Sequence, residues 1–152
     1  MQLSSKCISE WTFITGVVLF LISGVCVASG AAPSTAPEPQ VPYRVECESG
    51  IQKCKVDKST YIGWRTYHAV CHVCHAQNAV GSTFAPSLLT RLEGMDKARF
   101  DDVVGNGFTG QVGVMPGWKD DPNVMPRLDD LWHYLKARSD GALGVGKPGR
   151  LP

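Results

Sequence analysis

Residues Cys71-His72-Val73-Cys74-His75 (CHVCH) decide how the rest of the chain is interpreted. Two cysteines separated by two residues, with a histidine directly after the second, are typical of covalent attachment to haem through the vinyl groups of the porphyrin. The histidine of such a motif supplies an axial nitrogen ligand to the iron. The motif therefore predicts one haem c, bound covalently through Cys71 and Cys74, with His75 as an iron ligand.

Composition limits the size and the partners of the protein. The chain has 152 residues and a formal net charge of +1 at pH 7, with charges of both signs spread along it. This length leaves room for one domain. The sequence has neither the basic stripe of a nucleic-acid-binding protein nor an acidic tail, so nucleic acid is not an expected partner.

The first thirty residues differ in composition from the rest. Residues 11–28 form a nearly uncharged apolar run, and small residues follow at 28–32, as a signal-peptidase site requires. We therefore expect residues 1–30 to be a secretory signal peptide and the mature protein to be periplasmic. The alternative is an uncleaved anchor, because the run is close to the ~18 residues that a spanning helix needs. Only in that case is the membrane an expected partner.

Two further cysteines lie between the leader and the motif. Cys47 and Cys54 follow a Pro/Ala-rich segment, residues 31–42, which is expected to be an extended linker. In an oxidising compartment the pair is expected to form a structural disulfide that staples the N-terminal extension of the domain. A metal or redox site is the alternative for this pair, although such a site favours a closer spacing or nearby histidines. The haem domain is expected to span residues 43–145, followed by an irregular tail at 146–152.

Helical patterns account for most of the chain after residue 59. Helices are expected over residues 60–70, at Leu88 and Leu89, over 96–104, and from Pro126 towards Gly141. We find no strand pattern of any length. The sequence therefore predicts an all-α fold with its helices packed around the haem.

The iron needs a second axial ligand, whose identity separates electron transfer from chemistry on a bound molecule. Met115 is expected to be this ligand, because it lies in a glycine-rich loop, 106–117, that can cross the far face of the haem. Met95 opens a helix and Met125 directly precedes one, so neither suits the role. A thioether ligand favours ferrous iron, as an electron carrier requires. A haem enzyme or gas sensor with an open iron position is the alternative.

Two more residues are expected near the haem. The carbonyl of Pro86 is free to accept a hydrogen bond from the second ring nitrogen of His75, which would orient that ligand. The other interpretation of Pro86 is a turn proline before a short helix. Trp118 and the glycines around Met115 are expected to line the exposed haem edge.

Together, these residues resemble the class I c-type cytochromes. The shared features are Gly63 and Tyr67, the CHVCH motif, Pro86 and Leu88, Met115 and Pro116, and Leu131 with Tyr134. The resemblance implies a small helical fold in which the first and last helices cross beside the haem, with Gly63 against Leu131 and Tyr134. It also implies that Pro86 and Leu88 belong to the haem surroundings.

A narrower resemblance covers the chain from Cys47 to about Pro148. The four-cysteine arrangement and the segments 115–124 (MPGWKDDPNV) and 128–144 (LDDLWHYLKARSDGALG) are similar to the methanol-metabolism-related cytochromes. That family implies an electron carrier that is not an enzyme. It would accept electrons from a periplasmic alcohol or methanol dehydrogenase that uses pyrroloquinoline quinone (PQQ), and a downstream cytochrome c or terminal oxidase would be its acceptor.

Functions of other kinds remain as alternatives. A thiol oxidoreductase would use Cys71 and Cys74, but such a domain has a β-α-β pattern around its motif, which this sequence lacks. A structural zinc site needs four ligands, and the wide spacing of Cys47 and Cys54 argues against them as the second pair. Within electron transfer, the alternative is a membrane-tethered cytochrome subunit of a dehydrogenase or oxidase complex.

Overall fold

The computed structural model describes residues 41–48, 50–51 and 53–152. The expected signal peptide, residues 1–30, and all of the linker before residue 41 lie outside the described residues. In the part of the chain that is described, no helix is both long enough and apolar enough to span a membrane.

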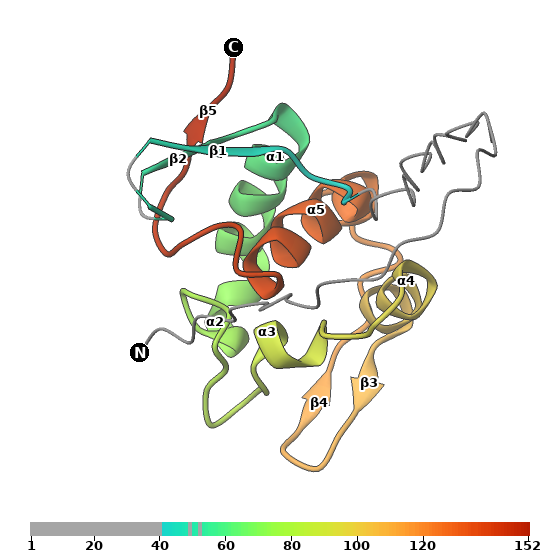
Figure 1. Cartoon of the computed structure of the whole chain (residues 1–152). Helices are drawn as coiled ribbons and strands as arrows, with labels where there is room; N and C mark the ends of the chain where they lie inside the picture. Colours follow the sequence, from blue (N-terminus) through green and yellow to red (C-terminus); the bar gives the residue numbers. More distant parts are fainter. Residues whose placement is uncertain (1–40, 49, 52) are drawn as a thin grey trace, which may run out of the picture. The chain divides into compact units, whose positions relative to one another are not determined.

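Helices form most of the regular structure in the described part (Figure 1). Their bounds are α1 Lys58–Thr66, α2 His72–His75, α3 Leu88–Arg91, α4 Lys97–Asn106 and α5 Leu128–Ser139, with a π-helical turn η1 Tyr67–Cys71 and a 3-10 turn η2 Met125–Arg127. All four expected helices are present. The first continues beyond residue 70, through η1 and into the CHVCH motif.

Two aspartates explain where helices α1 and α4 begin. The carboxylate of Asp57 accepts hydrogen bonds from the backbone N–H of Thr60 at 2.9 Å and from its hydroxyl at 2.7 Å. The carboxylate of Asp96 accepts one from the backbone N–H of Arg99 at 2.7 Å. Each side chain satisfies an amide that the first helical turn leaves unpaired. These caps set the starts of α1 and α4.

Short strands correct the expectation of an all-α fold. The strands are β1 Val45–Cys47, β2 Cys54–Val56, β3 Phe108–Thr109, β4 Val114–Met115 and β5 Gly149–Arg150. β1 and β2 pair antiparallel, β5 pairs parallel to β2, and β3 and β4 form a separate antiparallel pair. Strands of two or three residues are too short to show a period of two in sequence. The fold is mostly helical, and the tail at 146–152, expected to be irregular, contributes a strand.

The predicted disulfide between Cys47 and Cys54 is present. It joins residues that face each other across β1 and β2. A residue after α5 also binds the loop that the disulfide closes: the backbone N–H of Gly144 donates a hydrogen bond to the carbonyl of Ile51 at 3.0 Å. The N-terminal extension is therefore attached both to itself and to the segment after α5.

Removing this disulfide is expected to lower stability without changing the haem site. In the double variant C47S/C54S, the free energy of unfolding should fall by about 2.5 kcal/mol, since the bond closes a short loop in the unfolded chain. Urea unfolding of the haem-loaded protein measures this. The visible spectrum should stay the same, because β1 and β2 lie away from α2 (Figure 1). A changed visible spectrum in the C47S/C54S variant would contradict the expectation that the disulfide does not affect the haem site.

Helices α1 and α5 cross in close contact at Gly63. A Cβ atom at residue 63 would lie 1.9 Å from the carbonyl oxygen of Asp130 and 2.8 Å from the Cβ of Tyr134. Further along the crossing, the rings of Tyr67 and Tyr134 pack with centroids 5.6 Å apart. Leu131 is buried in the same core. The crossing implied by the resemblance is therefore present, and the backbone of α5 makes its closest approach.

Candidate haem site

The CHVCH motif occupies the end of the helical segment that starts with α1. η1 ends at Cys71 and α2 carries the other four residues of the motif. The helix stops at His75 because the next residue, Ala76, has a φ of +64°, in the left-handed region. The hydroxyl of Tyr67 donates a hydrogen bond to the carbonyl of Ala76. Burial raises the pKa of Tyr67, so this hydroxyl stays protonated and keeps donating at neutral pH.

Cys71 and Cys74 are both free thiols. Cys71 is half-buried and Cys74 is exposed. Burial raises the pKa of the Cys71 thiol to about 12, and the neighbouring Cys74 adds to the increase. A thiol oxidoreductase needs a thiol of lowered pKa, so this environment does not favour that alternative. The zinc alternative loses its second pair of ligands, because Cys47 and Cys54 are bonded to each other.

His75 is buried, and its Nδ1 lies 3.0 Å from the carbonyl oxygen of Pro86. A carbonyl can only accept, so Nδ1 carries the proton and Nε2 keeps a free electron pair. Burial lowers the pKa of His75, although the hydrogen bond to Pro86 acts in the opposite direction. The imidazole is therefore favoured in the neutral form that metal ligation requires. The hydrogen bond predicted between His75 and Pro86 is present.

The loop from residue 76 to residue 87 is shaped so that Pro86 reaches His75. The backbone N–H of Gly81 donates to the carbonyl of His75 at 3.1 Å, and the Ser82 hydroxyl donates to the carbonyl of Cys74 at 2.5 Å. Gly81 has a φ of +87°, and a Cβ there would lie 2.7 Å from the carbonyl carbon of Pro86. Only glycine fits this close approach. Turn-forming residues predicted a loop here, but the sequence offered no signal for the close approach of Gly81 to Pro86.

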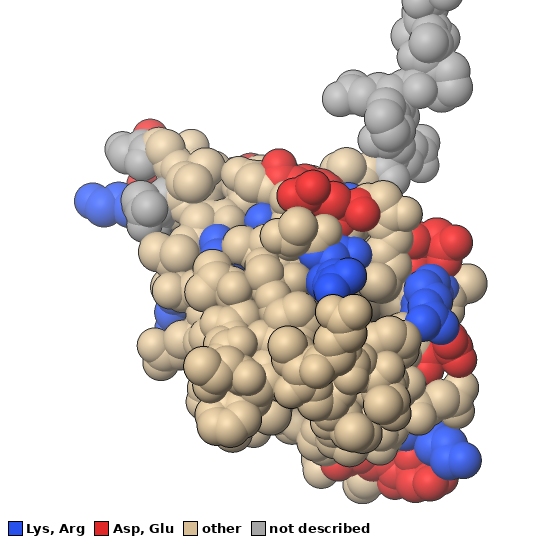
Figure 2. All heavy atoms as spheres, turned by 90° about the horizontal axis from the view of Figure 1, so that it is seen from below, with Lys and Arg blue, Asp and Glu red and all other residues tan. Residues whose placement is uncertain are grey.

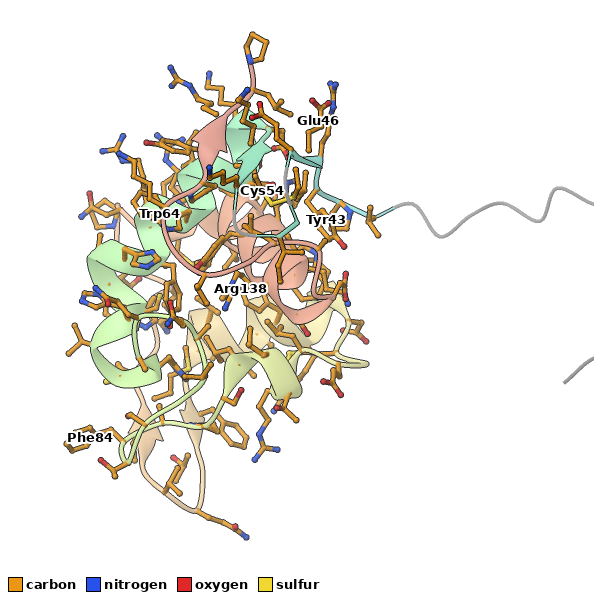
Figure 3. All side chains as sticks on the ribbon, turned by 60° about the vertical axis from the view of Figure 1, so that its left-hand side comes forward. Tyr43, Glu46, Cys54, Trp64, Phe84 and Arg138 are labelled. Carbon is orange, nitrogen blue, oxygen red and sulfur yellow. A yellow bond between two sulfur atoms is a disulfide. The ribbon has the colours of Figure 1, made fainter. Side chains whose placement is uncertain are left out.

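Arg138 holds the same loop from the last helix. Its side chain is buried, and its guanidinium donates to the carbonyl of Leu143 at 2.7 Å and to that of Asn78 at 3.0 Å. Figure 3 shows the labelled Arg138 in the interior of the fold. The sequence alone gave no signal for this role. The arginine connects the segment after α5 to the turn that follows the motif.

Met115 lies on β4, so the stretch expected to be a loop contains a hairpin. Its side chain is partly buried and packs against the core, as do those of Cys71, Leu88 and Trp118. The segment after Met115 is anchored to the end of α4, where the backbone N–H of Trp118 donates to the carbonyl of Val104 at 2.9 Å. Leu88 and Trp118, two of the residues predicted to surround the haem, therefore pack against the same core as Met115, whereas Pro86 is exposed.

Exposed apolar side chains surround this site. They belong to the motif, to the loop after it and to the hairpin: Val73, Val80, Phe84, Phe108, Val112 and Val114. Phe84 is 74% exposed, and Figure 3 shows it projecting away from the fold. Figure 2, which views the side where Figure 1 draws α2 and the β3–β4 hairpin, shows a broad area without Lys, Arg, Asp or Glu. Such a patch marks an interaction surface or a ligand site.

The residues present fit a haem c. Two free thiols stand at the spacing that covalent attachment needs, and a neutral imidazole with a free Nε2 follows directly. A partly buried thioether and an apolar surface complete the set of groups. These donors are soft or borderline ligands of the kind that haem iron takes from proteins.

Comparisons with known proteins find several cytochromes that are similar to the chain. The family model described as cytochrome C oxidase, cbb3-type, subunit III, matches residues 60–135. Cytochrome c-555 of Methylococcus capsulatus is 36% identical over 93 residues, which cover 60% of this chain and 72% of that protein. The chain belongs to the class I c-type cytochromes. Its family establishes covalently bound haem c and electron transfer, and not catalysis, as the role of this cytochrome.

Two further relatives are similar to this cytochrome. Cytochrome c-553I of Paracoccus denitrificans is 37% identical over 99 residues, which cover 62% of the cytochrome and 44% of that protein. The crystal structure of the c-type cytochrome XoxG from Methylobacterium extorquens AM1 is 44% identical with a TM-score of 0.60, covering 63% of the cytochrome and 60% of that chain. The cytochrome therefore spans less than half of cytochrome c-553I and about three fifths of XoxG. Its single CHVCH motif makes it a mono-haem electron carrier.

Proposed function

We propose that Cys71 and Cys74 bind the haem covalently and that His75 and Met115 are the axial iron ligands of a periplasmic electron carrier. The observation that carries this proposal is the 3.0 Å hydrogen bond from His75 Nδ1 to Pro86, directly after two free thiols. It orients the imidazole and leaves Nε2 as the ligating atom. The bound group supplies one-electron redox chemistry at its iron. The polypeptide holds and orients that group and limits its contact with water.

Two features support the proposed periplasmic location. Residues 1–30 have the composition of a signal peptide. Cys47 and Cys54 are bonded to each other, and disulfides persist in oxidising compartments such as the bacterial periplasm. Because covalent haem and a disulfide then occur in the same chain, its maturation would take place outside the cytoplasm.

The proposed electron donor is a PQQ-dependent alcohol or methanol dehydrogenase, and the proposed acceptor is a downstream cytochrome c or terminal oxidase. Support comes from the similarity of segments 115–124 and 128–144 to the methanol-metabolism-related cytochromes. The first of these segments starts at Met115 and includes Trp118, and both side chains pack against the same hydrophobic core as Cys71. The similarity therefore falls partly on residues that we propose to lie near the haem.

A second candidate is a membrane-tethered subunit of a dehydrogenase or oxidase complex. The matching family model is described as an oxidase subunit, and residues 11–28 form an apolar run. N-terminal sequencing of the protein isolated from cells separates the two candidates. A mature chain that starts near residue 31 supports the free carrier, and a chain that keeps residues 1–30 in the membrane fraction supports the tethered subunit.

Covalent attachment through the motif is tested by extraction. Acid–acetone is expected to leave the haem with the wild-type protein, because thioether bonds survive this treatment. The variant C71S/C74S should release all of its haem, and each single serine variant should keep one thioether bond and a spectrum with one unsaturated vinyl group. The visible spectrum of the extracted protein is the measurement. Haem release from the wild type would contradict attachment at these cysteines.

The donor is tested by stopped-flow reduction. A purified PQQ-dependent alcohol dehydrogenase is expected to reduce the ferric cytochrome with a second-order rate constant of about 10⁵–10⁷ M⁻¹s⁻¹, the ordinary range for protein partners. A dehydrogenase of another cofactor class is the control. If the control reduces the cytochrome equally fast, the proposed donor is wrong, while the role as an electron carrier stands.

A further inference from the structure

A pocket of about 320 Å³ lies between the outer face of α1–η1 and the segment that leads into α5. Its polar lining is Arg65, Thr66, Asn123 and Arg127, and its apolar lining is Ile62, Ala69 and Val70. Two guanidinium groups beside an amide favour a carboxylate, because guanidinium matches carboxylate geometry with two parallel hydrogen bonds. The apolar lining suits the methylene groups that carry a carboxylate in an acidic side chain.

The two arginines of this pocket are poorly neutralised within the chain. Some other basic side chains, namely Arg44, Lys55, Lys97 and Arg99, lie within 2.7 Å of a carboxylate oxygen. Among the described residues, Arg65 is in no ion pair, and the carboxylate nearest to Arg127 is that of Asp130 at 3.8 Å. That carboxylate also accepts a hydrogen bond from Ser59. The pocket therefore has an excess of positive charge.

The pocket is also close to the proposed haem attachment. Val70 lines it and directly precedes Cys71 in the chain. We infer that the pocket receives an acidic side chain of the electron-transfer partner and so brings the partner's surface beside the haem. This inference rests on the proposed function. A free inorganic anion would gain nothing from the apolar lining, so we assign the site to a protein carboxylate.

Charge reversal tests the inference by kinetics. Arg65→Glu is expected to lower the second-order rate constant for reduction by the dehydrogenase about tenfold at low ionic strength, because complementary charges steer association. The difference should shrink with added salt. The reduction potential and the visible spectrum should be those of the wild type, since Arg65 is exposed.

Lys53→Glu is the matched control, with the same change in net charge. Lys53 is exposed and, within the described part of the chain, forms no ion pair. It adjoins Cys54, which Figure 3 shows at the end of the fold opposite Phe84. The rate constant for reduction of the Lys53→Glu variant by the dehydrogenase is expected to stay within about twofold of the wild type, because this substitution changes only the general charge of the protein. Equal losses in the two variants would overturn the inference and leave the proposed function intact.

A second measurement does not depend on the identity of the donor. A capped peptide of three glutamates is titrated into the haem-loaded, ¹⁵N-labelled protein, with sodium phosphate in a parallel titration. The peptide should shift the amide signals of Ile62, Arg65, Val70 and Arg127, and Arg65→Glu should abolish these shifts. No shifts with the peptide, or equal shifts with phosphate, would overturn the inference even if the dehydrogenase reduces the wild type.

Discussion

Replacing Met115 by alanine is expected to lower the reduction potential of the haem-loaded cytochrome by more than about 100 mV, part of the ~0.8 V range that axial ligands span. A thioether stabilises ferrous iron, so its removal favours the ferric state. Met115 is partly buried, and the peptide that follows it is anchored to α4 through Trp118 and Val104. The hairpin therefore holds the thioether in place, and no other methionine is expected to replace it.

Potentiometric titration followed by visible spectroscopy measures this effect. Met125→Ala is the matched control, because Met125 is also a partly buried methionine but lies in η2, directly before α5. Its potential is expected to match that of the wild type. If Met115→Ala leaves both the potential and the spectrum unchanged, Met115 is not a ligand. An iron with an open position, as in a haem enzyme or gas sensor, would then be the better hypothesis.

Replacing Gly63 by alanine is expected to lower the free energy of unfolding by about 3 kcal/mol, near the upper end of the usual cost of overpacking. Helix propensity alone predicts the opposite sign, because alanine is about 1 kcal/mol better than glycine in a helix interior. At residue 63, the cost of the steric clash is larger than the gain in helix propensity. The added Cβ would lie 1.9 Å from a backbone oxygen of α5, and a backbone atom cannot turn away as a side chain can.

Gly105→Ala is the control for this substitution. Gly105 is also a helical glycine, in α4, and a Cβ there would meet no atom within 4 Å among the described residues. Its replacement is therefore expected to leave stability unchanged or to raise it by up to about 1 kcal/mol. Urea unfolding of both haem-loaded variants gives the comparison. A similar loss of unfolding free energy in both variants would show that the crossing of α1 and α5 does not depend on the absence of a side chain at Gly63.

The sequence was informative where one residue type is needed for a chemical or steric reason. The spacing of Cys71, Cys74 and His75 predicted the haem c that the family carries. The resemblance to the class I c-type cytochromes implied the crossing of the first and last helices at Gly63 and Tyr134, and the free carbonyl of Pro86 was predicted as the acceptor for His75. The roles of His75 and Met115 at the iron remain our proposal.

The sequence was uninformative where function depends on residues brought together from distant segments. The strands β2 and β5 are separated by most of the chain, and strands of this length have no pattern of their own. The hydrogen bond from Arg138 to Asn78 and the basic pocket at Arg65 and Arg127 likewise join distant segments and require the folded arrangement.

The CHVCH motif by itself determined the kind of cofactor, because covalent attachment and ligation use atoms that lie within five consecutive residues. The sequence also predicted the hydrogen bond from His75 to Pro86, but only the tertiary structure showed how the chain forms that bond and where it places Met115. His75 gains its acceptor from a loop that Gly81 allows to close, and Met115 gains its position from a hairpin anchored to α4. His75 and Pro86 are 11 residues apart, and Val104 and Trp118 lie on either side of the hairpin, so the backbone conformation of the intervening segments sets the geometry of these contacts.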